Sequence, residues 1–116
     1  MMYTTLALAL ALSATAAPGP TSAAPSQAAP IVVHMRDFTF APRTLRVAAG
    51  TVVTFVNDDS EAHTARASDG SFSSGGLDYH DSWRHAFAKP GTFAYFCELH
   101  PYMKGTIVVV RAGENA

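Results

Sequence analysis

Three side chains of types that bind metal ions lie close together near the C-terminal end of the sequence. Cys97, His100 and Met103 follow one another within the segment FCELHPYMKG. Apolar, β-prone sequence precedes and follows them, so the local structure expected is a strand, a short loop and a second strand. In such a loop a thiolate, an imidazole and a thioether can converge on one point. This donor set suits copper, which alternates between soft Cu(I) and harder Cu(II).

A mononuclear copper site of this kind needs a second imidazole to complete a trigonal set of two histidines and one cysteine. His63 is the best candidate, because it follows the strand predicted at 51–56 through a polar connection. It would therefore lie at the same end of the domain as Cys97. Met103 would then be a long and weak axial ligand, a position that tunes the redox potential.

Cys97 is the only cysteine of the chain, so it has no disulfide partner within the chain. In an exported protein an exposed free thiol is open to oxidation, and the thiol is therefore expected to be either buried and inert or bound to a metal. Zinc is the competing metal, but a thioether is not among its usual ligands. A c-type haem is excluded, because its C-x-x-C-H attachment motif needs a second cysteine.

Short β-strands separated by turn residues must position these side chains. The sequence has no helical periodicity, and its apolar pattern predicts about seven strands, at 31–36, 44–48, 51–56, 64–67, 83–88, 92–97 and 106–111. Alternation along the sixth of these places Cys97 on the inward face. The first strand is expected to break at Ala41-Pro42, and the acidic segment 58–61 is expected to be a solvated loop. The fold class predicted is an all-β Greek-key sandwich.

The first thirty residues do not have the composition of a folded domain. An apolar run, LALALAL, is followed by Ala14-Thr15-Ala16, which has the spacing of a signal peptidase site. The run is too short to span a membrane, which takes about 20 apolar residues. We therefore predict a signal peptide at 1–16, a disordered Ala-, Pro- and Ser-rich linker at 17–30, a folded domain at 31–112 and a C-terminal tail at 113–116. The mature chain is expected to be periplasmic or secreted, with no integral membrane span.

Two stretches of the folded domain resemble a known family. The segment CELHPYMKG at 97–105, with its lead-in PGTFAYFC at 90–97, is similar to the ligand loop of amicyanin and related small plastocyanin-like cupredoxins. The segment GTVVTFVN at 50–57, with His63 six residues after its Asn, is similar as well. The resemblance extends over residues 31–111, so the folded domain is identified as a cupredoxin domain.

The resemblance implies a type 1 (blue) copper site that holds one copper ion. Its equatorial ligands would be His63, Cys97 and His100, and its axial ligand would be Met103. In the family the C-terminal histidine reaches the surface within an apolar patch through which the electron leaves. Carried over, this is the role of His100, with Leu99, Pro101 and Tyr102 around it. Thr64 stands where the family often has Asn, and its backbone N–H could approach the Cys97 sulfur.

The function expected is one-electron transfer between exported redox partners, with protein partners docking near His100. The alternative is a copper-binding or copper-delivery protein of the cell envelope, and a third reading is a module that passes electrons into a larger oxidase or dehydrogenase. An enzyme is not expected, because four protein ligands leave no open position for a substrate. The net charge of −1 argues against a nucleic acid partner, and we expect a monomer.

Overall fold

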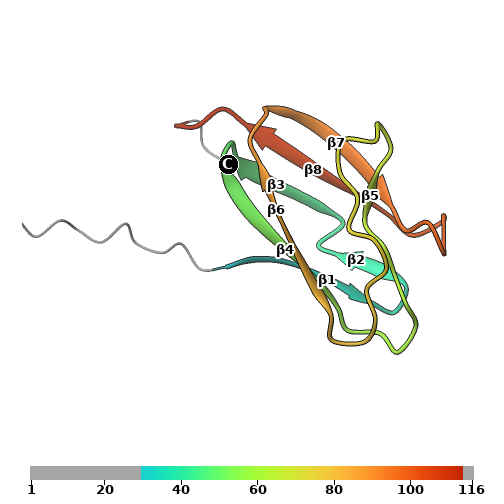
Figure 1. The fold of residues 1–116 in the computed structure, drawn as a ribbon. Coiled ribbons are helices and arrows are strands. Elements are labelled where there is room, and N and C mark those ends of the chain that lie inside the picture. The colour runs from blue at the N-terminus through green and yellow to red at the C-terminus, as the bar shows by residue number, and fades with distance from the viewer. Residues whose placement is uncertain (1–29, 114–116) are drawn as a thin grey trace, which may run out of the picture.

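Segments of alternating apolar and polar residues form the β-strands of this protein. This computed structural model describes residues 30–113, which form eight strands and no helix (Figure 1). The strands are β1 (Ile31–Arg36), β2 (Thr39–Ala41), β3 (Thr44–Ala48), β4 (Thr51–Asn57), β5 (Arg66–Ala67), β6 (Ser82–Phe87), β7 (Gly91–Phe96) and β8 (Lys104–Val110). The predicted all-β class is confirmed, with eight strands instead of about seven.

The predicted terminal segments fall largely outside the described residues. These are the signal peptide at 1–16, all but the last residue of the linker at 17–30, and the tail at 113–116 beyond its first residue. Within residues 30–113, no helix is long and apolar enough to cross a membrane.

The strands form two four-stranded sheets that face each other as a sandwich (Figure 1). One sheet has the order β2-β1-β4-β6 and the other has the order β3-β8-β7-β5. Both sheets are mixed, because β1 pairs with β4 and β3 with β8 in parallel, whereas the other pairs are antiparallel. Since β1 and β4 run in the same direction, the loops that follow them leave their sheet at the same end.

The additional strand, β2, follows a turn that the sequence analysis did not predict. Asp37 and Phe38 have positive φ angles of 53° and 56°, and β2 then returns antiparallel to β1. A left-handed backbone costs a residue with a side chain about 1–2 kcal/mol, so an apolar pattern gives no signal for such a turn. The first strand was predicted to break at Ala41-Pro42, but it ends earlier, at Arg36, and the residues before Pro42 form the separate strand β2.

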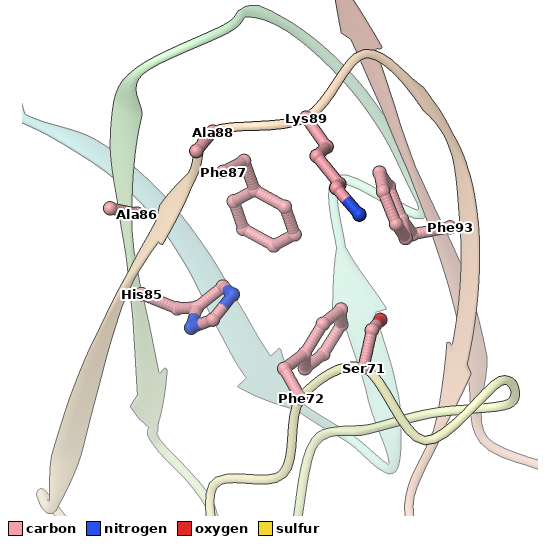
Figure 2. Close-up of a pocket in the computed structure, with 8 residues that line it drawn as sticks. All are labelled: Ser71, Phe72, His85, Ala86, Phe87, Ala88, Lys89 and Phe93. Atoms are coloured by element: carbon pink, nitrogen blue, oxygen red, sulfur yellow. The ribbon is translucent and has the colours of Figure 1, made fainter.

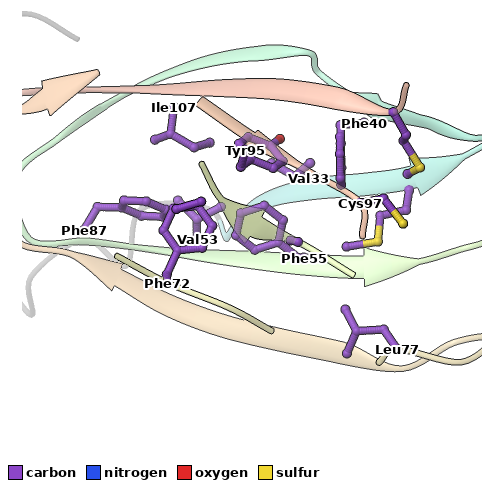
Figure 3. Close-up of a cluster of buried hydrophobic side chains, with 14 of the residues drawn as sticks. Val33, Phe40, Val53, Phe55, Phe72, Leu77, Phe87, Tyr95, Cys97 and Ile107 are labelled. Atoms are coloured by element: carbon purple, nitrogen blue, oxygen red, sulfur yellow. The ribbon is translucent and has the colours of Figure 1, made fainter. Parts of the chain in front are cut away.

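Side chains that point inward from both sheets fill the space between them (Figure 3). Val33 on β1, Phe55 on β4 and Tyr95 on β7 each expose at most 1% of their surface. Burying one such side chain completely contributes about 1.5–3 kcal/mol. Cys97 is fully buried at one end of the same cluster, which confirms its predicted inward direction (Figure 3).

Candidate metal centre

Three of the predicted ligands meet at the end of the sandwich where β4 and β7 end. Cys97 directly follows β7, and its Sγ atom lies 3.8 Å from Nδ1 of His63 and 3.7 Å from Nδ1 of His100. All three ligand atoms lie within 4.8 Å of one another. His63 and Cys97 are fully buried, whereas His100 is partly exposed. The structure therefore brings together a thiol and two imidazoles from distant parts of the chain.

Met103 is placed by the short loop that carries the thiol. The Cys97 N–H donates to the Met103 carbonyl at 3.0 Å, and the Met103 N–H donates to the His100 carbonyl at 2.8 Å. These two bonds close the loop between β7 and β8 into a fixed shape. The Met103 side chain is 1% exposed and belongs to the same core cluster as Cys97. Its thioether is thus held in the interior beside the other predicted ligands.

Asn57, the last residue of β4, organises the loop that leads to His63. Its buried side-chain amide donates to the carbonyls of Glu61 and Leu77, both at 2.8 Å, and its side-chain oxygen accepts the Asp59 N–H at 2.8 Å. His63 and Leu77 then exchange two backbone hydrogen bonds, at 3.0 and 2.8 Å. Because this buried amide is hydrogen-bonded, it fixes the backbone before His63 and the segment at Leu77 that pairs with it.

Thr64 joins the histidine loop to the cysteine loop with two of its atoms. Its backbone N–H points at the Cys97 sulfur, 3.3 Å away, as the resemblance suggested. Its hydroxyl oxygen accepts the N–H of Glu98 at 2.8 Å. An N–H aimed at the sulfur helps to hold it in place beside the two imidazoles, as outer-shell partners do in metal sites.

Asp59 contacts the ring of His63 on the side away from the sulfur. Its Oδ2 atom lies 2.7 Å from His63 Nε2. Burial acts to raise the pKa of Asp59, but the hydrogen bonds that it accepts from the Phe38 N–H, from His63 and from the Asp37 N–H outweigh burial and hold that pKa below its usual value. A carboxylate can only accept, so Nε2 carries the proton and Nδ1 is free to bind a metal. The expectation of a solvated acidic loop is wrong for Asp59, whose side chain is only 13% exposed.

Exposed apolar side chains surround His100 at the surface. Leu99 and Tyr102 are 56% and 69% exposed, and Pro101 between them is exposed too. Phe38 is 37% exposed, and its ring centroid lies 4.9 Å from that of His100. The first three were predicted for this surface. Phe38 was not, because it reaches the site only through the turn before β2.

The donor set fits copper better than it fits zinc. It combines a buried thiol, two imidazole nitrogens and a buried thioether, and such soft and borderline donors select copper. A structural zinc site would use four strong ligands of the cysteine, histidine or carboxylate type. Among residues 30–113, His63, Cys97 and His100 are also the one group of three or more histidine, cysteine or acidic side chains close enough to hold a metal ion.

Comparison with known proteins places this site in a family. A family model described as the cupredoxin-like domain matches residues 2–109. The chain belongs to the cupredoxin family. Amicyanin-alpha of Methylorubrum extorquens is 32% identical to this cupredoxin over 82 residues, which cover 66% of this chain and 69% of amicyanin-alpha.

Solved structures give the same assignment. A purple cupredoxin from Nitrosopumilus maritimus is 26% identical with a TM-score of 0.65, and the match covers 69% of this chain and 99% of that one. The reduced Cu(I) form of an amicyanin variant is 26% identical with a TM-score of 0.67, and the match covers 76% of this chain and 89% of the amicyanin chain. The copper-containing nitrite reductase from Thermus scotoductus is 34% identical with a TM-score of 0.68 over 76% of this chain, but the chain spans only 23% of that enzyme.

Family and donor set together identify the cofactor. This is a small blue copper cupredoxin with an all-β sandwich fold, as the sequence analysis predicted. Its cofactor is one type 1 copper ion, for which the cluster of His63, Cys97, His100 and Met103 supplies a suitable set of donors.

Proposed function

We propose that this cupredoxin is a one-electron carrier in which His63, Cys97 and His100 are the strong copper ligands and Met103 is the weak axial ligand. The observation that carries the proposal is that the chain's own hydrogen bonds hold the three strong donor atoms within 4.8 Å of one another. When bound, copper supplies the Cu(II)/Cu(I) couple, which exchanges one electron.

The residues around the site resist movement of the ligands. Five hydrogen bonds within the protein restrain the donor residues. They are the two backbone bonds of the Met103 loop, the two bonds between His63 and Leu77, and the bond from the Thr64 N–H to the Cys97 sulfur. They are made by the protein chain itself and hold the donor atoms before any metal binds. A ligand set that keeps its shape in both states needs little reorganisation, and this favours fast electron transfer over release of the metal.

His100 is the ligand through which we propose that electrons pass to protein partners. It is partly exposed, and the exposed side chains of Leu99 and Tyr102 beside it offer an apolar contact surface. Apolar surface with a polar rim is typical of docking sites on soluble proteins. We propose that the partners are exported redox proteins, that this protein acts as a monomer in the periplasm or outside the cell, and that it has no enzymatic activity of its own.

Copper delivery is the second candidate function, and it shares the same ligands. A delivery protein must hand over its metal, so its ligands should be accessible. The complete burial of His63 and Cys97 favours the carrier instead. The third reading, a module of a larger redox enzyme, is supported by the likeness to part of the nitrite reductase chain.

The test is an absorption spectrum of the protein loaded with Cu(II), recorded beside that of Cys97→Ser. The carrier proposal expects an intense visible band from thiolate-to-copper charge transfer, which the variant lacks. Repeated reduction and reoxidation should leave the copper bound, even when a metal-free acceptor protein is present. A colourless Cu(II) complex of the wild type would overturn the proposal, and loss of copper on reduction would favour delivery.

A further inference from the structure

The turn between β1 and β2 has a backbone that needs outside support. Asp37 and Phe38 are consecutive residues with side chains, and both have positive φ angles, 53° and 56°. Residues with a Cβ atom seldom adopt this conformation, because the side chain crowds the following carbonyl. Two such residues in a row persist only where surrounding groups hold them. The structure supplies those groups from the loop after β4.

A single carboxylate, that of Asp59, holds this turn and a copper ligand at the same time. Its Oδ1 atom accepts the Asp37 N–H at 2.8 Å, and its Oδ2 atom accepts the Phe38 N–H at 3.0 Å. The same Oδ2 atom accepts the Nε2–H of His63 at 2.7 Å. All three donors therefore depend on one side chain, and movement of the turn and movement of the ligand ring are coupled.

The turn places the ring of Phe38 against both imidazoles of the proposed copper site. The Phe38 centroid lies 5.3 Å from that of His63 and 4.9 Å from that of His100, with interplanar angles of 83° and 84°. Edge-to-face contacts at these distances are favourable. An imidazole that leaves its ligand position must displace the Phe38 ring, and His63 must also break its bond to Asp59.

We propose that Asp59 is a positioning residue and that Asp37, Phe38 and Asp59 form a clasp over the ligand histidines that slows copper release. The inference rests on the proposed ligand role of His63 and His100. Asp59 keeps the Nε2–H tautomer of His63, so that Nδ1 faces the sulfur in the metal-free protein as well. Phe38 opposes outward rotation of either ring. The clasp thus explains how a site with one partly exposed histidine acts as a carrier that retains its metal.

Asp59→Ala removes every hydrogen bond that the carboxylate accepts, whereas Asp59→Asn removes only part of them. An amide has one acceptor oxygen, whereas Asp59 uses both of its oxygens, so the variant must lose either the Asp37 bond or the two bonds made to Oδ2. Phe38→Ala removes the ring alone, at a position that is 37% exposed and keeps its backbone bond to Asp59. Asp58→Asn is the matched control, because Asp58 is the neighbouring acid but binds His34 and Arg36 rather than a ligand.

The experiment measures how fast Cu(I) passes from each holoprotein to an excess of a colorimetric Cu(I) chelator. We expect Asp59→Asn and Phe38→Ala to release copper at least about tenfold faster than the wild type, the usual size of an effect from an outer-shell partner. Asp58→Asn should match the wild type. In the metal-free proteins, imidazole nitrogen NMR should show His63 fixed as the Nε2–H tautomer in the wild type and a mixture in Asp59→Ala, which has no side-chain acceptor at this position.

The two proposals fail in different ways. Equal release rates for all four proteins, with the blue band intact, would overturn the clasp and leave the electron-carrier function standing. An unchanged His63 tautomer in Asp59→Ala, which leaves no acceptor beside Nε2, would overturn the positioning role of Asp59. Absence of the blue band from the wild type would overturn the proposed function itself.

Discussion

At the scale of single residues, Thr64 supports the start of the loop that carries Cys97 and His100. Its hydroxyl is the acceptor for the Glu98 N–H, directly after Cys97, and the residue is 6% exposed. Thr64→Val keeps the shape of the side chain but leaves the Glu98 N–H unpaired. We therefore expect it to lower the free energy of unfolding of the metal-free protein by about 1–3 kcal/mol. Urea denaturation measures this cost. Thr44→Val, at an exposed position of β3, is the control and should change stability by less than about 0.5 kcal/mol.

The sequence predicts the proposed ligands but not the groups that contact them. Cys97, His100 and Met103 could be predicted because their spacing is local, and His63 because a predicted strand directs the chain to the same end. Phe38 and Asp59 could not. Their contact joins residues 21 positions apart through a left-handed turn, and no residue in that turn is glycine. From the sequence pattern, Asp59 was therefore predicted to be one of several solvated acidic side chains.

At the scale of elements, the pairing of β7 with β8 depends on a glycine. Gly105 lies opposite Tyr95 in the register, and a Cβ atom on Gly105 would fall 2.8 Å from Cε1 of the Tyr95 ring and closer still to its hydroxyl. Phe40 lies 4.5 Å from the same ring by centroid distance, so the ring has little room to move. Gly105→Ala should therefore lower the free energy of unfolding by about 1–3 kcal/mol, the usual cost of overpacking.

Gly76→Ala is the matched control, because open space surrounds that glycine. If overpacking against Tyr95 is the cause, the double variant Gly105→Ala with Tyr95→Leu should lose less stability than the two single changes added together. Denaturation curves of the metal-free proteins measure the change in the free energy of unfolding for the two single variants, the double variant and the Gly76→Ala control. Strict additivity would show that the two positions are not in contact.

The strand β6 carries a histidine whose titration should affect stability. His85 stacks on Trp83 with a centroid distance of 5.1 Å and lines a cavity of about 180 Å³ together with Phe72, Phe87 and Phe93 (Figure 2). Burial lowers the pKa of His85 below its ordinary value of 6.5. The folded protein thus binds fewer protons there than the unfolded chain does, so its stability is greatest above about pH 6.5 and falls as the pH drops below that value.

The variant His85→Phe keeps a ring in the stack and removes the titrating group. Its free energy of unfolding should fall less than that of the wild type between about pH 7 and pH 5. Denaturation of the metal-free proteins at a series of pH values gives the comparison. Parallel pH curves for the two proteins would mean that His85 is as accessible to protons in the folded state as in the unfolded chain.

At the scale of the whole molecule, the period-two pattern was sufficient to predict the sandwich. Every strand expected from alternation is present, although β5 is shorter than the predicted 64–67. β2 was missed, because it exists only where the chain reverses at Asp37 and Phe38. An alternating apolar pattern indicates which face of a strand is buried. It carries no information about a turn whose backbone is held by the carboxylate of a residue far along the chain.

The copper ion should stabilise the whole domain, because its proposed ligands come together only in the folded chain. In the unfolded chain His63 is separated from Cys97 by 34 positions, so the complete site is absent. At a free copper concentration 100-fold above Kd, binding adds about 2.7 kcal/mol. In a domain of this size each kcal/mol raises Tm by about 4–8 °C, so the expected rise is at least about 10 °C. Scanning calorimetry with Cu(I) under anaerobic conditions measures it, since oxygen would otherwise oxidise the thiol. The rise should be much smaller in Cys97→Ser, and an equal rise in both proteins would place the bound copper away from the sulfur.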